Sequence, residues 1–226
     1  MIIAWAFVLK FIGKLLLYSS LSFGATYFSK NNFNKKLRSN FKRIGDELQF
    51  SFFLQKRNVF NAIAPPALSG MWKERAVDFT STDYVNQSFK ISMTTGNKRE
   101  TFKIQPKKIW KSLINKSQII KTDNQEMNKK FLIKGTNSTF IQSVFDKELA
   151  HYFVLHQNAI KHTITIKPYE ISVIFVSAQK EENMKNGSLE KDIKFMLSLM
   201  DKIANRMENV AYSSRLIGKK SIPILV

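Results

Sequence analysis

The chain has 226 residues, with 36 lysines and arginines against 17 aspartates and glutamates, so its formal net charge is +19. It contains no cysteine, which excludes disulfides, cysteine nucleophiles and thiolate metal sites. A charge of this size favours partners with acidic surfaces, namely anionic lipid, nucleic acid or an acidic protein.

The first 45 residues contain eight lysines and arginines and no acidic side chain, and they include an apolar run from Ile2 to Phe28. About 20 helical residues cross the hydrocarbon core of a bilayer, so this run predicts a single-pass transmembrane anchor over residues 1–29. Trp5 and Tyr27 lie near its two ends, where the headgroup regions would be. Polar side chains recur every four residues along one helical face, at Lys10, Lys14, Tyr18, Ser22 and Thr26. This row also fits a helix lying flat in the interface, and a cleaved targeting segment is a third interpretation.

The length of the run favours a span, and the two lysines inside it then need an explanation. Each lysine near the centre of a span costs roughly 2.5–3.5 kcal/mol on insertion scales. In one interpretation Lys10 and Lys14 face an acidic group of another subunit or a phospholipid headgroup. In the other, the helix lies shallow or tilted and both ammonium groups reach the interface along their aliphatic stems.

A group of basic residues, the basic collar, directly follows the run. Its members are Lys30, Lys35, Lys36, Arg38, Lys42 and Arg43. Because basic residues next to a span stay on the cytoplasmic side, the rest of the chain is expected in the cytoplasm, or in the matrix or stroma of an organelle. We assign residues 30–60 to this collar and to an amphipathic helix from Phe33 to Phe53, whose apolar residues recur at three- or four-residue spacing. Gly45 weakens the middle of that helix by roughly 1 kcal/mol relative to alanine, so we expect a break there.

Residues 61–213 have the pattern of an α+β domain, and 214–226 form a short basic C-terminal tail that we expect to be docked or frayed. Alternating apolar and polar residues predict strands over 75–79, 89–93 and 101–104, with a turn at 95–97 between the last two. Further strands are predicted over 131–133, 160–166 and 171–176, and the last two form a hairpin. Helices are predicted near 139–157 and 189–211, and a polar loop over 121–128. The sequence therefore predicts an antiparallel sheet with one wet face, packed on the other face by two or three helices.

Side chains that carry chemistry do not gather into a recognisable motif. His151 and His156 are five residues apart, about 140° around a helix, and His162 falls on a predicted strand, so no metal site is expected. Glu74 and Asp78 are predicted to lie on the wet face as solvated charges. Nucleotide-binding and hydrolase motifs are absent from the sequence. We therefore expect no catalytic residue and no cofactor, and hence no enzyme.

A further signal is carried by five segments: Ile44–Phe50, Pro66–Gly70, Arg75–Phe79, Thr122–Asp123 and Asn128–Gly135. In this order they resemble an uncharacterised family of bacterial single-pass membrane-anchored α+β proteins. The resemblance covers roughly Phe41 to Met207, and Glu74 stands where that family usually has a glycine. It implies an anchor, this order of helices and strands, and structural turns and strand starts at the shared segments, and it brings no activity.

The leading functional hypothesis is a non-catalytic, membrane-anchored accessory or assembly subunit of a larger membrane protein complex. The alternative is a peripheral basic module that binds anionic lipid or nucleic acid. Nucleic acid is the less favoured ligand, because single-strand readers expose aromatic residues on a sheet face. Phe89 and Phe102 on predicted strands are better explained as core residues.

Overall fold

The computed structural model describes residue 35 and residues 38–55, 66–83, 88–107, 119–176 and 188–220. The predicted anchor, with Trp5, Lys10, Lys14, Tyr18 and Tyr27, lies outside these ranges, as do Lys30 and Lys36 of the basic collar. Within the described ranges, no helix combines the length and the apolar character that a bilayer crossing requires.

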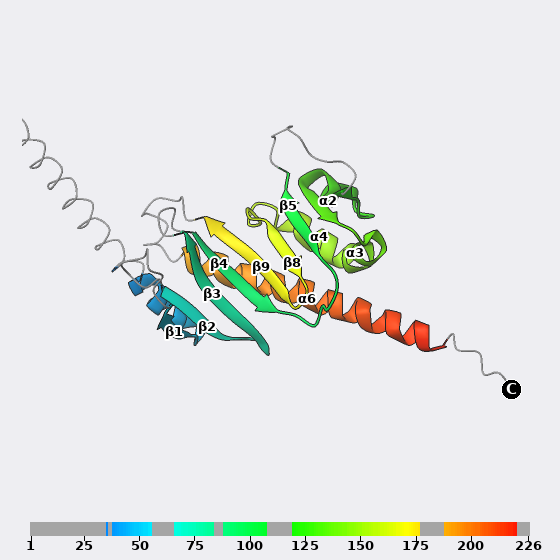
Figure 1. Cartoon of the computed structure of the whole chain (residues 1–226). Coiled ribbons are helices and arrows are strands. Elements are labelled where there is room, and N and C mark those ends of the chain that lie inside the picture. The colour runs from blue at the N-terminus through cyan, green and yellow to red at the C-terminus, as the bar shows by residue number, and fades with distance from the viewer. Residues whose placement is uncertain are drawn as a thin grey trace, which may run out of the picture.

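The described strands form one antiparallel sheet (Figure 1). They are β1 (Ser51–Leu54), β2 (Pro66–Trp72), β3 (Arg75–Asp83), β4 (Ser88–Thr94), β5 (Phe102–Pro106), β6 (Ile119–Ile120), β7 (Phe131–Gly135), β8 (Ile164–Lys167) and β9 (Glu170–Val176). Their order across the sheet is β1-β2-β3-β4-β9-β8-β5-β7-β6, and every neighbouring pair is antiparallel. The predicted α+β class with an antiparallel sheet is confirmed.

Strand register separates the two faces of the sheet cleanly. One row of partners across eight strands is entirely buried: Leu68, Phe79, Ile91, Val173, Ile164, Ile104, Ile133 and Ile120. The row next to it, on the opposite face, is polar: Ser69, Asp78, Ser92, Ser172, Thr165, Lys103 and Lys134. Successive side chains of a strand point to opposite faces, so this alternation gives the sheet one packed and one wet face, as predicted.

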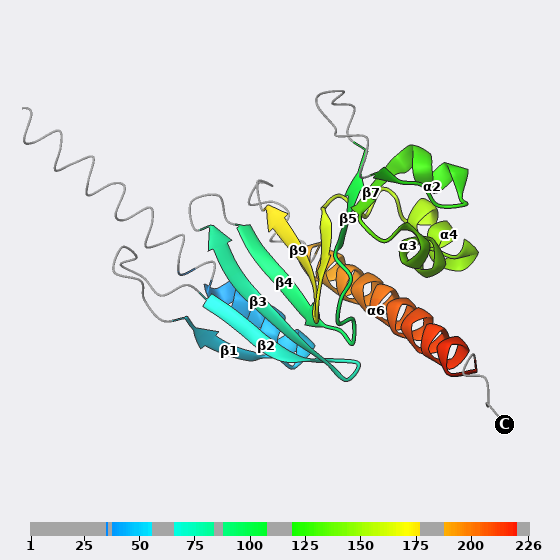
Figure 2. The same ribbon diagram turned by 45° about the vertical axis from the view of Figure 1, so that its right-hand side comes forward.

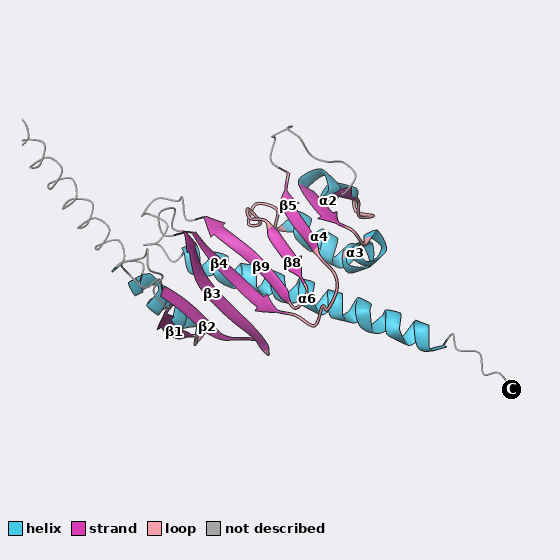
Figure 3. Ribbon diagram, viewed as in Figure 1, coloured by secondary structure: helices cyan, strands magenta, loops and turns pink. Residues whose placement is uncertain are grey.

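Helices cover the packed face. They are α2 (Gln125–Lys130), α3 (Ser138–Val144), α4 (Lys147–Leu155), α6 (Ser188–Lys220) and a helix over 38–48. The helix over 38–48 and α6 run along the same face, and α2, α3 and α4 gather near β5 and β7 (Figure 2). The cyan helices of Figure 3 make this layer easy to follow. The inner stripe of α6 joins the single core cluster through Ile193, Met196, Leu197, Met200, Ile203 and Met207.

The helix predicted from Phe33 to Phe53 is wrong at its C-terminal end. It stops after Leu48, because Gln49 is left-handed (φ 58°) and the Phe50 amide donates to the Gly45 carbonyl at 2.8 Å. The Gln49 amide donates to the Asp46 carbonyl, so both bonds of a Schellman motif are present. Strand β1 follows at once.

The predicted break at Gly45 is also wrong, because this glycine lies inside the helix and is buried. A Cβ there would lie 2.9 Å from Leu68 Cδ2, so the glycine lets the helix approach the sheet. Phe41 and Ile44 belong to the core cluster. The packed domain therefore begins before residue 61, and α6 continues to Lys220, into the segment that we predicted as a tail.

Three further local predictions need correction. The helix predicted over 139–157 is two helices, because the Asp146 carboxylate accepts from the Leu149 amide and starts α4 anew. Helix α2 begins within the loop predicted over 121–128, where Asn124 caps it by accepting from the Met127 amide at 2.9 Å. The strand predicted from Ile160 begins only at Ile164.

The turn at 95–97 is present, but the strands on either side of it do not pair. Strand β4 pairs with β3 and β9, whereas β5 pairs with β7 and β8. Buried Asn97 holds this crossover in place: its side chain donates to the Glu100 carbonyl at 2.8 Å, and its carbonyl accepts from the Tyr169 amide at 2.6 Å.

Candidate partner-binding groove

The turn between β2 and β3 positions the long helix α6. Its two central residues, Lys73 and Glu74, are left-handed with φ of 47° and 68°, the geometry of a type I′ turn that matches the twist of the two strands. Glu74 therefore lies in the turn and not on the wet face of a strand, whereas Asp78 is exposed as predicted. The turn brings Arg75 over α6.

Arg75 clamps α6 through three side chains. Its Nε donates to Asp201 Oδ1 at 3.1 Å, and its two terminal nitrogens donate to the two carboxylate oxygens of Glu208 at 2.7 and 2.8 Å. It also donates to Asn205 Oδ1 at 2.7 Å. The side chains of Arg75 and Asp201 are only 13% and 7% exposed, so this contact is largely shielded from water. The hydrogen bond from Arg75 lowers the pKa of Glu208, and the Gly96 amide donates to the same carboxylate at 2.7 Å.

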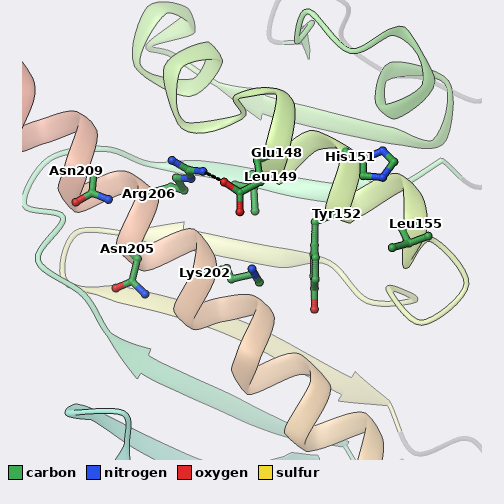
Figure 4. A pocket seen from close by; sticks show the side chains of 9 residues that line it. All are labelled: Glu148, Leu149, His151, Tyr152, Leu155, Lys202, Asn205, Arg206 and Asn209. Carbon is green, nitrogen blue, oxygen red and sulfur yellow. Dashed lines mark hydrogen bonds and ion pairs between the residues drawn. The ribbon is translucent and has the colours of Figure 1, made fainter.

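A groove of about 330 Å³ lies between α4 and the face of α6 that carries Lys202, Asn205, Arg206 and Asn209 (Figure 4). Its lining residues are Glu148, Leu149, His151, Tyr152, Leu155, Lys202, Asn205, Arg206 and Asn209. The two helices present these residues because α4 begins anew at Asp146 and α6 is held at Asp201 and Glu208 by Arg75. Local capping and a long-range ion-pair network thus define the two walls.

The charges on the groove floor are partly neutralised. Arg206 pairs with Asp146 at 3.0 Å and with Glu148. These ion pairs connect α6 to α4 and neutralise the charge of the arginine. Lys202 lies 4.9 Å from the centroid of the Tyr152 ring. The described part of the chain contains no carboxylate in ion-pair contact with Lys202, so its ammonium charge is open to the groove.

The aromatic wall of the groove is built from Tyr152 and the rings behind it. His156 and Phe195 lie with their ring centroids 4.3 and 6.4 Å from that of Tyr152. Burial raises the pKa of Tyr152, so the phenol stays neutral and can donate a hydrogen bond at physiological pH. At the open end, Leu155 is 67% exposed. The groove therefore offers an ammonium group, amide groups, an aromatic ring and an exposed aliphatic side chain.

The three histidines lie in three different places. His151 lines the groove, His156 packs against Tyr152, and His162 lies 4.4 Å from the ring of Phe175. Among the described residues, no group of three or more histidine, aspartate or glutamate side chains could hold a metal ion. The groove itself presents hydrogen-bonding, charged and apolar side chains.

The described members of the basic collar are elsewhere, on the helix over 38–48 and just before it. Lys35 and Lys42 are exposed, and Arg43 pairs with Glu190 of α6 at 2.9 Å. Arg38 is half-buried. Of the residues that line the groove, only His151 was singled out from the sequence, and only as a possible metal ligand. The available signal was the four-residue spacing of Lys202 with Arg206 and of Asn205 with Asn209, which places each pair on one face of α6.

Comparison with known proteins gives a similarity in structure but none in sequence. Neither a protein-family model nor a curated protein sequence matches the chain. The crystal structure of the mycobacterial trehalose monomycolate transport factor A, TtfA, is similar with a TM-score of 0.48 and 9% sequence identity, over 74% of this chain and 95% of that chain. At these values the similarity assigns neither a family nor a function.

Proposed function

We propose that the protein is a non-catalytic accessory or assembly subunit of a membrane protein complex, anchored by residues 1–29 and extending its domain on the cytoplasmic side. The observation that carries this proposal is the groove between α4 and α6. Its walls are fixed by caps and ion pairs, and its contents suit recognition rather than bond making.

The groove fits a segment of a partner protein that carries an acidic and an apolar side chain. The acidic group would meet the Lys202 ammonium, which lies over the Tyr152 ring, and the apolar group would cover the exposed Leu155. The Asn209 side chain adds amide groups that can bond to a peptide backbone. Tyrosine is among the residue types that most often dominate the binding energy of protein interfaces.

The anchoring part of the proposal is supported by the sequence of residues 1–45. An apolar run long enough to cross a bilayer is followed by the basic collar, and the first acidic residue is Asp46. Lys10 and Lys14 would then meet an acidic group of a neighbouring subunit or a lipid headgroup.

The test is purification of the tagged full-length chain from its native membranes in a mild detergent, with mass spectrometry of the sizing-column peak. The wild type is expected in a large particle of fixed composition. Leu155→Glu should release the partner, whereas the matched control Met71→Glu should not. Met71 is similarly exposed (61%), but it lies on the wet face of β2, opposite the face that the helices cover. A peak at the monomer mass for the wild type would refute the proposal.

A peripheral module that binds anionic ligands is the second candidate, and the exposed Lys35 and Lys42 together with Lys103 favour it. Binding would then fall steeply with salt, because neutralised phosphates release counterions. Phe89 and Phe102 are buried at 5% and 1% exposure, so these two rings cannot stack on bases. Anionic lipid is therefore the better ligand for this second candidate.

A further inference from the structure

One edge of the domain combines exposed apolar and exposed basic side chains. Strand β1 is the edge strand of the sheet, and it pairs with β2 alone among the described strands. Its residues Phe52, Phe53 and Leu54 are 36%, 44% and 45% exposed. We call these three residues, together with exposed Lys35 and Lys42, the basic edge.

The helix over 38–48 turns its lysines toward this edge. Arg43 and Glu47 pair with Glu190 and Lys194, so their flank of the helix faces α6. Lys42 lies about 100° around the helix from Arg43, and the buried Phe41 and Ile44 point into the core, which directs Lys42 away from α6. Lys35, seven residues before Lys42, is exposed as well.

The apolar side chains of β1 project on both faces of the strand. Phe52 is opposite buried Leu68, so it lies on the helix-covered face, next to the lysine flank. Phe53 is opposite Ala67 and lies on the other face. A strand that is apolar on both faces and at a sheet edge is a liability in water unless something covers it.

The residues that precede the helix over 38–48 indicate what covers the exposed apolar side chains of β1. The apolar run ends at Phe28, and the nine residues 29–37 can reach at most about 35 Å to residue 38. Aromatic side chains flanked by lysines suit the headgroup region, where apolar rings insert and ammonium groups meet anionic phosphates. Asp46, four residues after Lys42, lies on the same flank of the helix. The basic edge therefore sets two lysines, Lys35 and Lys42, against this one carboxylate.

We propose that the basic edge docks on the headgroups of an anionic phospholipid bilayer, with the β1 aromatic rings inserted, and thereby fixes the orientation of the domain. This inference rests on the proposed anchoring of residues 1–29. In this orientation α6 leads away from the membrane: Figure 1 shows the helix over 38–48 and β1 at one end of the molecule and the C-terminal end of α6 at the other. The groove is then held clear of the lipid surface.

The absence of cysteine allows a direct test with single labels. The full-length chain carrying Phe53→Cys, or Leu54→Cys as a second position, is labelled with an environment-sensitive dye and reconstituted in phosphatidylcholine vesicles with or without phosphatidylglycerol. Brominated lipid serves as the quencher. The matched control is Ile174→Cys, because Ile174 is an equally exposed apolar residue (51%) on β9.

The expected result is a blue-shifted, lipid-quenched dye at residue 53 in anionic vesicles and a water-exposed dye at residue 174. Lys42→Gln and Lys35→Gln should each weaken the docked population about fivefold, and neutral vesicles should abolish it. A water-exposed dye at both 53 and 54 in anionic vesicles would overturn the proposal. So would equal quenching at 174, which indicates indiscriminate contact, or a lipid-independent, concentration-dependent blue shift, which indicates a second copy pairing with β1.

Alkaline extraction of the same vesicles separates this inference from the anchoring itself. A chain that resists extraction but shows no quenching at residue 53 retains its anchor and overturns the docking. A chain that is extracted at alkaline pH, yet is quenched at residue 53 when vesicles are added at neutral pH, overturns the anchor and supports the docking.

Discussion

Replacing Arg75 with methionine tests how much this one side chain adds to the apolar packing that holds α6 on the sheet. Methionine keeps the length and apolar stem of arginine but removes every donor. Among the described residues, the substitution leaves Asp201, 7% exposed, with Lys73 at 3.3 Å as its one charged partner, and Lys73 is itself 62% exposed. Glu208 keeps the Gly96 amide at 2.7 Å and the Thr95 hydroxyl as hydrogen-bond donors.

The magnitude follows from how much of the network is buried. Breaking a fully buried ion pair by removing one partner costs 3–5 kcal/mol, whereas exposed pairs contribute roughly 0–1 kcal/mol. The Asp201 contact is near the buried limit, but Glu208 is 35% exposed and is screened by water. We therefore expect Arg75→Met to lower the free energy of unfolding by about 3 kcal/mol. In a domain of this size that lowers the melting temperature by roughly 6–12 °C.

The assay is chemical unfolding of the full-length chain in a non-ionic detergent, followed by circular dichroism. Lys73→Met is the matched control and should cost less than about 1 kcal/mol, because its ion pair is exposed on the lysine side. Adding Asp201→Asn to Arg75→Met should recover part of the loss, because it removes the charge left without its partner. The reasoning is refuted if Arg75→Met costs no more than Lys73→Met, or if the double variant is simply additive.

The pH dependence of stability gives the same network an independent signature. The pKa of Glu208 is lower in the folded chain than its ordinary value of 4.5, chiefly because Arg75 donates to it. Its contribution to stability is therefore present above pH 4.5 and lost as the pH falls through the lower folded value. Arg75→Met should flatten this part of the acid unfolding curve and leave the curve above pH 6 parallel to that of the wild type.

Three other substitutions test local features of the fold by the same unfolding assay. Glu74→Gly should stabilise the chain by about 1 kcal/mol, because glycine accepts the left-handed φ of 68° without strain, and a loss of stability would contradict the turn geometry. Gly70→Ala should destabilise by about 1–3 kcal/mol, because its Cβ would lie 2.2 Å from Phe50 Cδ1, and a neutral result would show that the ring moves freely. Asp146→Ala should cost about 1–2 kcal/mol through the lost cap of α4 and the lost Arg206 contact, with Asp123→Ala, an exposed loop residue, as its neutral control.

The strands with strict alternation were predictable because the same residues decide both the local pattern and the burial. Phe89, Ile91 and Met93 point into the core and the residues between them point out, so β4 was predicted within a residue of its ends. Helix α6 was predicted for the same reason. Strand β2 was missed because its periodicity is hidden: Ala67 and Leu68 are adjacent and both fully buried, and Gly70 has no side chain to reveal its face.

Pairing and helix ends were harder to predict because they depend on contacts that are distant in sequence or on single hydrogen bonds. The alternation of 89–93 and 101–104 predicts two strands. It does not show that β9 pairs with the first and β8 with the second, which keeps the two from pairing with each other. The ends of the helices depend on Gln49 in a left-handed conformation and on the carboxylate of Asp146, neither of which changes the apolar periodicity. The groove was unpredictable for a related reason, since its walls come from α4 and α6, about 50 residues apart.

The ion pairs of α6 explain how a groove at one end of the domain could keep a fixed position relative to a surface at the other. The helix has 33 residues, about 50 Å at 1.5 Å per residue, and its charged residues pair in order with successive parts of the fold. Glu190 meets Arg43 beside the basic edge, Asp201 meets Arg75 over the sheet, and Arg206 meets α4 at the groove. Because the same rigid element makes all three contacts, any tilt of the basic edge carries the groove with it. Weakening the middle contact at Arg75 should therefore loosen partner binding at Leu155 even though no residue that lines the groove is substituted. The detergent purification of Arg75→Met would show this as a partial loss of partner.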